Sequence, residues 1–401
     1  MRIIYHHRTR STDAQRIHIR EIVKAFESFG HEVEIVSLIP IDAQEGNAER
    51  DASEALWKRC ARRVPFGYEI VQLAYNLVGI PMLLAALWRR NVHFIYERYS
   101  LFNFTGVIAA RLFGIPLILE VNSPFALEQS RDKEIRSFRL AQWSERFICN
   151  HATQIITVST PLARILQSSG ISRRLITVMA NGVSIEDFRP GVAEPELLAK
   201  LGLVGQVVIG FVGWFRNWHG LDLLLRAFHQ GNPAALGAKL LLIGDGPAMS
   251  GLRATVRELG LEQNVIFAGP VPHVEVPRYL DLIDITVQPS ANEYCCPMKI
   301  LEYMALGKAI VAPRQENIQE LLHEPEEAQF FTQGDVTSLM DALVTLVRDR
   351  QRRIDTGLRA KAAITGRGYL WTTNAQRVIE ISESALRLSS VSVEPESASR
   401  F

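Results

Sequence analysis

Short apolar runs alternate with longer amphipathic segments along almost the whole chain. The runs are largely apolar, as expected for strands of a parallel sheet that helices cover on both faces. After the first run, residues 14–29 show apolar positions at helical spacing, with Thr12 and Gln15 as a capping-box start and Gly30 as a stop. In the first half of the chain the predicted strands are Arg2–His6, Val33–Leu38, Phe94–Tyr96, Leu117–Val121, Ile155–Val158 and Leu175–Val178.

The pattern breaks at Asn181–Pro190 and in the Gly/Pro/Glu segment Gly191–Glu196, and then restarts. Repeated βα units imply right-handed crossovers and a doubly wound sheet. Two such series joined by one linker predict an α/β protein with two Rossmann-like domains, residues 1–185 and 186–369, and a cleft between them. A last helix is expected at about 370–388, and the polar tail 389–401 is predicted to be disordered. The predicted strands of the second half are Val207–Val212, Lys239–Ile243, Val265–Phe267, Ile285–Gln288 and Ala309–Val311.

The composition fits this architecture. A chain of 401 residues is too long for one ordinary core and sufficient for two. Its 47% hydrophobic and 22% charged residues are typical of a globular protein. The formal net charge of +1 gives no reason to expect nucleic acid as a partner.

The cysteines and the apolar stretches suggest a cytoplasmic location. No C-x-x-C pair is present, so a disulfide framework is not expected and the thiols are predicted to be reduced. The N-terminus shows no signal-peptide pattern. The longest apolar stretch, Leu77–Trp88, is about a dozen residues, short of the roughly twenty that a membrane-spanning helix needs. The protein is therefore expected not to cross a membrane. The four cysteines are Cys60, Cys149, Cys295 and Cys296.

The stretch NEYCCPMKILEYMALGKAIVA, residues 292–312, is the most informative for chemistry. Pro297 suits the first turn of a helix over Met298–Leu306, where a missing N–H costs nothing. Lys299 and Glu302 share one helical face. A helix N-terminus with a lysine in its first turn favours a diphosphate, and the glutamate can accept hydrogen bonds from ribose hydroxyls. The alternative is an exposed Lys–Glu pair of little consequence.

Two further stretches follow predicted strands. In VIGFVGWFRNWHGLDLLLR, residues 208–226, a buried strand ends at Gly213 and a loop carries Arg216 and His219. Arginine can hold phosphate oxygens through charge-assisted hydrogen bonds. The alternative is that Arg216 is a surface arginine on a loop with no role in binding. In IGDGP, residues 243–247, Gly244 begins a tight turn that is interpreted as structural, with a base or ribose contact as the alternative.

Taken together, these motifs resemble the retaining glycosyltransferase family 4, which has the GT-B fold. The second half matches in VGWFRNWHGLDLLLRAF, LLIGDGP, NVIFAG and CCPMKILEYMALGKAIVA, and the first half in HIREIVKAFESFGHEVEIVS, IITVSTPLARIL and VMANGVSIEDFRP. The resemblance implies transfer of a sugar from a nucleotide-diphosphate sugar, held by the second domain, to a glycan, lipid-linked or small-molecule acceptor facing the first. It also implies that the last helix, with Trp371, crosses back onto the first domain.

The resemblance implies roles for particular residues. Glu302 matches the family glutamate that binds the ribose, and Arg216 and Lys299 would neutralise the departing diphosphate. No D-x-D motif is present, so no metal cofactor is expected. Retention would follow from front-face attack assisted by the leaving phosphate. The remaining candidate donor contacts are Gly213, Trp214, His219, Gly244, Cys296, Pro297 and Met298.

Three departures from the family pattern stand out. The first glutamate of the usual E-x7-E pair falls on Tyr294, so Glu293, one residue earlier, is the candidate for its catalytic role. The glycine–arginine and lysine–glycine pairs of the phosphate loop appear as Gly213-Trp214 and His219-Gly220. The first βα loop lacks the usual glycines and offers Arg8 and Arg10 for phosphate instead.

The first domain is less readable. Arg98, Glu120 and Asn122 lie at or just after predicted strand ends, where acceptor binding and a plain loop role are both open. His18 is a further acceptor candidate, with a core or surface histidine as the alternative. The segment Trp57–Arg90 carries arginines around YNLVGIPMLLAALW, which suggests either a helix packed on the sheet or peripheral contact with the inner face of a membrane.

Other activities share this scaffold. A nucleotide-sugar 2-epimerase would give an epimerised sugar without an acceptor, and a phosphorylase would cleave a glycoside with phosphate. A non-catalytic partner protein that binds a nucleotide sugar would tolerate alanine at Glu302 or Lys299. The nucleotide, sugar, acceptor, linkage and oligomeric state stay open at this point.

Overall fold

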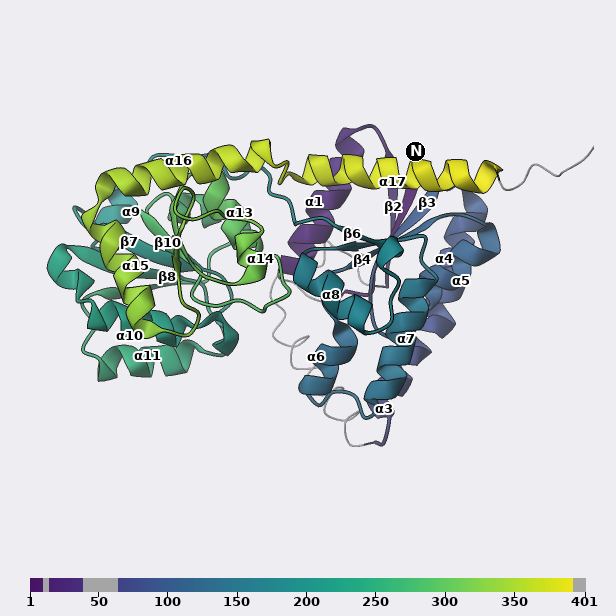
Figure 1. Cartoon of the computed structure of the whole chain (residues 1–401), viewed down its shortest axis with the longest axis horizontal. Coiled ribbons are helices and arrows are strands. Elements are labelled where there is room, and N and C mark those ends of the chain that lie inside the picture. The colour runs from purple at the N-terminus through teal and green to yellow at the C-terminus, as the bar shows by residue number, and fades with distance from the viewer. Residues whose placement is uncertain (10–13, 39–63, 392–401) are drawn as a thin grey trace, which may run out of the picture. The chain divides into compact units, whose positions relative to one another are not determined.

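The computed structural model describes residues 1–9, 14–38 and 64–391 and divides the chain into two compact units (Figure 1). Unit 1 comprises Met1–Met179 and Trp371–Phe401, and unit 2 comprises Ala180–Leu370. The second unit thus begins six residues before the predicted start at 186, because Val183 N–H donates to the Tyr369 carbonyl at 3.0 Å and ties this stretch to unit 2. The sequence expectations for Arg10, Thr12, Cys60, the part of the segment Trp57–Arg90 that precedes residue 64, and the tail beyond 391 fall outside the described residues.

Unit 1 is built on a six-stranded sheet with the order β2-β1-β3-β4-β5-β6. All its strand pairs are parallel, and the order reverses direction between β1 and β3. The two central strands β3 and β4 are buried along their whole length, as the unbroken apolar runs predicted. The strands are β1 Arg2–His6, β2 Glu32–Val36, β3 Phe94–Arg98, β4 Leu117–Val121, β5 Gln154–Thr157 and β6 Ile176–Val178.

Unit 2 holds a second six-stranded parallel sheet, with the order β12-β11-β10-β7-β8-β9. Its order reverses between β7 and β10. One strand, Gln329–Phe331, was not predicted, because a three-residue edge strand carries too little pattern. The prediction of two Rossmann-like sheets is confirmed. The strands are β7 Val207–Val212, β8 Ala238–Ile243, β9 Val265–Gly269, β10 Ile285–Val287, β11 Ala309–Pro313 and β12 Gln329–Phe331.

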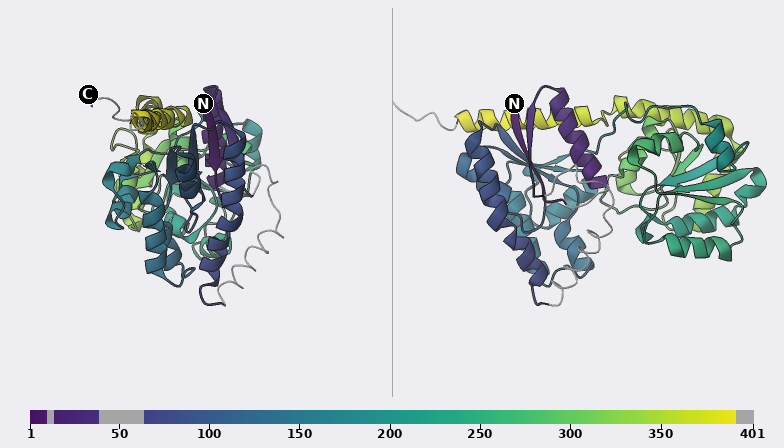
Figure 2. Two further views of the ribbon diagram at one scale, coloured as in Figure 1. Left: turned by 90° about the vertical axis from the view of Figure 1, so that its right-hand side faces the viewer. Right: turned by 180° about the vertical axis from the view of Figure 1, so that it is seen from behind.

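Helices cover the faces of each sheet (Figure 2). In unit 2 a continuous apolar core joins β7, β8 and β10 to the helices α10, α11 and α15. The helices of unit 1 are α1 Ala14–Ser28, α3 Gly67–Ala74, α4 Asn76–Arg89, α5 Thr105–Phe113, α6 Phe125–Arg131, α7 Phe138–Asn150, α8 Thr160–Ser168, the 3₁₀ turn η1 Arg173–Leu175 and α17 Trp371–Val391. Those of unit 2 are α9 Pro195–Lys200, η2 Asn217–His219, α10 Leu221–Gln230, η3 Pro233–Leu236, α11 Met249–Glu258, η4 His273–Glu275, α12 Val276–Leu280, α13 Met298–Ala305, α14 Glu316–Gln319, α15 Val336–Arg348 and α16 Arg350–Gly366.

The last helix belongs to unit 1, as expected from the resemblance. α17 packs beside α1, and the Trp371 ring meets the His18 ring edge-on with centroids 4.6 Å apart. Trp371 is buried, so the aromatic contact fixes the start of α17 on the first unit.

The helices α3 and α4 form one longer helical run than the sequence suggested. Tyr75, between them, has helical backbone angles, so the run extends over the 23 residues Gly67–Arg89. The apolar stretch Leu77–Trp88 noted in the sequence is thus the second half of a longer helix. By length and composition alone this run is the single candidate membrane span in the described part of the chain, and one such helix is weak support for a crossing.

Candidate active site

The loops after β7 and β10 in unit 2 gather most of the predicted donor-side residues. These strands are neighbours in the sheet, yet the connections that follow them leave in opposite directions. In doubly wound sheets, ligands bind at the carboxyl ends of such strands. Gly213 and the 214–220 turn follow β7, and the loop 288–297 leads from β10 to α13.

Lys299 brings a cation from α13 to the end of β7. Its Nζ lies 4.1 Å from the Phe211 ring centroid, and a Cβ added to Gly213 would stand 3.0 Å from it. Burial lowers the pKa of Lys299 to about 8, although the carboxylate of Glu302 opposes the shift. The Lys299 ammonium therefore lies beside the backbone of Gly213 at the end of β7. It is charged at neutral pH and loses its proton as the pH rises above about 8.

His219 lies in the same turn but carries no charge. It is buried, its Nδ1 accepts from the Arg216 backbone N–H at 3.4 Å, and its ring packs against Phe211. Burial and the nearby charges of Lys299 and Arg216 lower the pKa of His219 to about 2. Because it is neutral, His219 cannot replace the positive charge of the lysine that the family usually carries before this glycine.

The IGDGP turn is a close backbone crossing. Gly213 N–H donates to the Ile243 carbonyl at 3.0 Å, and Phe215 N–H donates to the Asp245 carbonyl at 2.6 Å. A Cβ on Gly244 would overlap the Gly213 carbonyl oxygen, and one on Gly246 would stand 2.6 Å from the Phe215 nitrogen. Both glycines have positive φ, at 130° and 152°. The geometry favours the structural interpretation of this turn, with Gly244 as the support beneath Gly213.

The loop before α13 is held by amide side chains that the sequence analysis missed. Asn317 Nδ2 donates to the carbonyls of Asn292 at 3.0 Å and Cys295 at 2.7 Å, and Gln315 Nε2 donates to the Ala291 carbonyl at 2.9 Å. Asn181 Nδ2 donates to the Cys296 carbonyl at 2.8 Å. These partners lie 22 to 115 residues apart in sequence, so no local pattern could have indicated them.

The predicted glutamates differ in their surroundings. The Glu302 side chain is 13% exposed, with His273 Nε2 4.0 Å from its Oε1. Glu293 is exposed, whereas the neighbouring Tyr294 is buried. Thus the side chain at the usual family position points inward and the glutamate one residue earlier reaches solvent. Cys149, Cys295 and Cys296 are free thiols.

In unit 1 three of the four acceptor candidates meet around the buried carboxylate of the fourth, Glu120. Arg98 Nη1 donates to Glu120 Oε1 at 2.5 Å, Asn122 donates to the same oxygen, and His18 Nδ1 lies 3.6 Å from it. Tyr5 OH donates to Glu120 Oε2 at 3.5 Å. Burial raises the pKa of Glu120, but the charges of His18 and Arg98 and the Asn122 hydrogen bond outweigh it, and the net shift is downward. Glu120 is thus ionised at neutral pH, and both of its oxygens have hydrogen-bond partners.

A second buried pair, His6 and Glu97, lies at the ends of the neighbouring strands β1 and β3 and was not predicted as a site. His6 Nδ1 lies 2.5 Å from Glu97 Oε2, and His6 Nε2 lies 3.0 Å from the Tyr75 hydroxyl. Arg8, proposed from the sequence for phosphate, instead donates to the Gln72 carbonyl at 3.0 Å and lies over the Tyr75 ring. From the sequence, His6 could be placed only at the end of a strand. Its partners Glu97 and Tyr75 lie on β3 and at the junction of α3 and α4, far from His6 in the chain, so no local pattern indicated the contacts.

Family models match both units. A glycosyl transferase 4-like domain matches residues 14–182, and a glycosyl transferases group 1 domain matches residues 206–349. The chain belongs to the family 4, or group 1, glycosyltransferases. The sequence-based assignment to this family and to the GT-B fold is confirmed.

Relatives of this glycosyltransferase act on several kinds of acceptor. It is 27% identical over 298 residues to a 2-deoxystreptamine N-acetyl-D-glucosaminyltransferase from Streptomyces fradiae, covering 71% of this chain and 69% of the relative. It is 25% identical over 336 residues to a D-inositol 3-phosphate glycosyltransferase from Corynebacterium urealyticum, covering 80% and 73%. An Escherichia coli relative, 23% identical over 296 residues, is a UDP-Gal:alpha-D-GlcNAc-diphosphoundecaprenol alpha-1,3-galactosyltransferase, with coverage of 70% and 73%.

Solved structures share the fold at low identity. HepE from Anabaena, solved in complex with UDP, superimposes with a TM-score of 0.70 at 18% identity, covering 96% of this glycosyltransferase and 100% of that chain. Sucrose-phosphate synthase from Thermosynechococcus elongatus gives a TM-score of 0.70 at 16% identity, with coverage of 97% and 100%. At these identities the likeness shows the fold.

Gly244→Ala is expected to lower the free energy of unfolding by about 3 kcal/mol, since the methyl group meets the Gly213 carbonyl and the backbone angle suits only glycine. Urea denaturation measures the change. Gly237→Ala is the matched control: Gly237 also has positive φ, at 74°, but open space around it, and a cost of about 1 kcal/mol is expected. Equal losses at the two positions would contradict the role of Gly244 in the crossing.

Proposed function

We propose that this glycosyltransferase transfers a sugar from a UDP-sugar to an acceptor hydroxyl with retention of anomeric configuration and without a divalent metal ion. The observation that carries the proposal is the Lys299 ammonium beside Gly213, at the start of α13 and the end of β7. A cation, the unpaired amides of a helix start and glycine backbone together suit a diphosphate. Glu302, one turn further along α13, would accept from the ribose hydroxyls.

The choice of UDP as the nucleotide rests on the similarity of this chain to other glycosyltransferases. HepE, which shares the fold, has been solved with UDP and with UDP-glucose, and the E. coli relative uses UDP-Gal. The acceptor class follows the relatives in the same way. Their acceptors include 2-deoxystreptamine, D-inositol 3-phosphate and a diphosphoundecaprenol-linked sugar, so we infer a hydroxylated ring, free or lipid-linked, as the acceptor.

In the proposed reaction, the bond between the anomeric carbon and the β-phosphate oxygen breaks, and the acceptor oxygen bonds to the same face of that carbon. The acceptor proton passes to an oxygen of the departing phosphate, which leaves as UDP. Lys299 and the first amides of α13 would stabilise the charge that develops on the diphosphate, the role a metal ion takes in other transferases. Arg216, exposed in the turn after β7, would contact the same phosphates.

On the acceptor side, unit 1 supplies ordered polar groups at the ends of β1, β3 and β4. Arg98 and Asn122 are held by Glu120, and His18 by Glu120 and Trp371. Fixed donors of this kind would orient acceptor hydroxyls with little loss of side-chain entropy on binding. Direct contact is proposed for Arg98, Asn122 and His18, and a positioning role for Glu120.

The direct test incubates the purified protein with UDP-glucose, UDP-galactose or UDP-N-acetylglucosamine and a panel of cyclitol and glycan acceptors, in EDTA and in Mg²⁺. We expect UDP release that depends on the acceptor, an α-linked product by NMR, and rates within about twofold in the two buffers. A β-linked product would overturn retention, and activity only with Mg²⁺ would overturn metal independence. Stabilisation by GDP or ADP but not UDP in a thermal-shift assay would overturn the donor assignment.

UDP affinity is expected to fall as pH rises through about 8, because the free protein loses the Lys299 proton there. The limiting slope is a factor of about ten per pH unit, since UDP would bind mainly the protonated form. Isothermal titration from pH 7 to 10 measures the UDP affinity, and Lys299→Arg should remove its pH dependence in that range.

The free energy of unfolding is expected to change in the opposite direction. The unfolded chain keeps the Lys299 proton to higher pH than the folded protein, so the free energy of unfolding should rise with pH above about 8.

A further inference from the structure

The helical run α3–α4 exposes apolar side chains along its whole length. Its buried side carries Glu69 and Gln72 in α3 but the apolar Leu83 and Leu87 in α4. Glu69 and Gln72, on the inner side, are 1% and 3% exposed, whereas Leu77 and Trp88, on the outer side, are 79% and 85% exposed. A surface helix normally buries its apolar stripe against the core. We define the outer residues as the apolar stripe: Ile70, Val71, Leu73, Leu77, Val78 and Trp88.

Specific contacts hold the helix in this orientation. Glu69 Oε1 accepts from the backbone N–H of Arg136 at 2.6 Å and of Ser137 at 3.3 Å, and Gln72 Nε2 donates to Gln129 Oε1 at 3.1 Å. Rotating the stripe inward would bury apolar side chains only by exposing these bonds. Passing the helix through a bilayer would carry the Glu69 carboxylate into hydrocarbon, which costs several kcal/mol (about 3). The apolar stripe is therefore expected neither to rotate into the core nor to cross a bilayer, and it remains exposed on the surface of unit 1.

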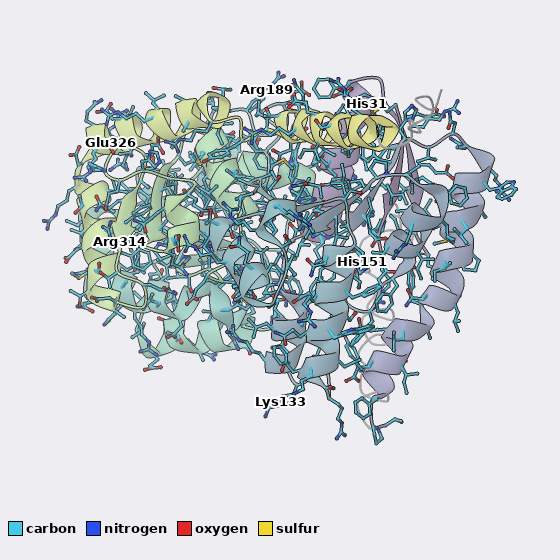
Figure 3. The ribbon with its side chains drawn as sticks, turned by 45° about the vertical axis from the view of Figure 1, so that its right-hand side comes forward. His31, Lys133, His151, Arg189, Arg314 and Glu326 are labelled. Atoms are coloured by element: carbon cyan, nitrogen blue, oxygen red, sulfur yellow. The ribbon has the colours of Figure 1, made fainter. Side chains whose placement is uncertain are left out.

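A cluster of cations lies beside the start of this helix. Between the end of α6 and the first turn of α7, four basic side chains are exposed, and Asp132 is the one exposed acid among residues 131–140. Figure 3 shows Lys133 projecting from this end of unit 1. Phe138 and Leu140 are exposed among them. We call this the basic tip, and its cations are Arg131, Lys133, Arg136 and Arg139.

The start of α3 and the basic tip line one pocket, so the basic tip lies beside the end of the helical run from which the apolar stripe begins. Val64 and Gly67, at the start of α3, line a cavity of about 340 Å³ together with Lys133 and Arg136. At the other end of the stripe, Trp88 is followed by the exposed Arg89. An apolar stripe with tryptophan and basic residues at its ends matches the boundary between headgroups and acyl chains of a bilayer.

We propose that unit 1 docks through the apolar stripe and the basic tip on the surface of an anionic lipid bilayer. The stripe enters the boundary below the headgroups, and the basic tip contacts lipid phosphates. The charge favours lipid over a second copy of the chain, since two basic tips brought together would repel. Docking does not depend on the proposed reaction, because no residue of the donor site takes part.

Vesicle co-sedimentation tests the proposal with the full chain. We expect binding to phosphatidylcholine vesicles that contain 30% phosphatidylglycerol at about 25 mM salt, and much weaker binding to phosphatidylcholine alone or at about 500 mM salt. Arg136→Glu/Arg139→Glu should weaken binding about thirtyfold or more. The control Arg348→Glu/Arg359→Glu changes the same charge on exposed positions of unit 2 and should leave binding unchanged.

Leu77→Gln tests the stripe without altering charge, and it too should weaken vesicle binding. A UDP thermal shift on every variant reports folding and the donor site separately, so loss of docking is distinguishable from failure of the proposed function. Equal loss in both charge variants, or no binding of the wild type to anionic vesicles, would overturn the proposal. So would a stable dimer in light scattering that Leu77→Gln dissociates, because the stripe would then be an interface between two copies.

Discussion

Lys299→Met is expected to lower kcat/KM for the UDP-sugar by about 10² to 10³, with little change in unfolding free energy. The methionine fills a similar volume over the Phe211 ring but carries no charge. If the transition state places growing negative charge on the diphosphate, the loss should fall mainly on kcat. Steady-state kinetics with each UDP-sugar measure the effect, and circular dichroism melting checks the fold.

Lys200→Met is the matched control, because Lys200 is an exposed lysine at the end of α9 in the same unit. It should leave kcat/KM within about twofold of the wild type. A Lys299→Met protein that melts normally and keeps full activity would remove Lys299 from the mechanism. Activity that survives with a tenfold weaker UDP affinity would instead assign Lys299 to ground-state binding.

Arg98→Met is expected to destabilise the protein by about 4 kcal/mol, the second large effect. Arg98 is nearly buried and donates to Glu120 Oε1, so its loss leaves a buried carboxylate short of a cationic partner. Chemical denaturation of the whole chain followed by circular dichroism and intrinsic tryptophan fluorescence would measure the change. The variant should also lose acceptor affinity if Arg98 contacts the acceptor.

The pH dependence separates this mechanism from simple loss of packing. In the wild type the pKa of Glu120 is lowered, so its stabilising contribution is present at neutral pH and lost as pH falls through that lowered value. Without Arg98, one of the charges that lowers the Glu120 pKa is missing, so we expect a higher Glu120 pKa in the variant than in the wild type. The deficit of Arg98→Met should therefore shrink as pH falls from 8 to about 5. Arg98→Met/Glu120→Gln should recover part of the loss, and a deficit independent of pH would contradict the charge argument.

Much of the fold could be predicted from the sequence because the buried strands of a parallel sheet are largely apolar. The strands Arg2–His6, Leu117–Val121 and Val207–Val212 were predicted to the residue. The predictions failed where an element was very short, or where the apolar pattern gave no clear start or end of a helix. The edge strand Gln329–Phe331 was too brief to detect, and the bounds of the helix within the segment Trp57–Arg90 were not predicted.

The donor side was likewise predictable because its motif is local. Pro297, Lys299 and Glu302 lie within one and a half turns of α13, so spacing alone places the cation and the carboxylate near the helix start. The loop that leads to this helix depends on Asn181, Gln315 and Asn317, whose hydrogen bonds join segments far apart in the chain. Local spacing carries no information about such partners.

The sequence by itself determined the family, the two parallel sheets and the position of a cation at a helix start, since these depend on periodicity and short-range motifs. Only the tertiary structure decided how the polar residues divide their roles. It joined Arg98, Asn122 and His18 around Glu120, and it left His219 uncharged by burying it beside Lys299. Burial and long-range neighbours set protonation and hydrogen-bond partners, and both depend on how distant segments pack.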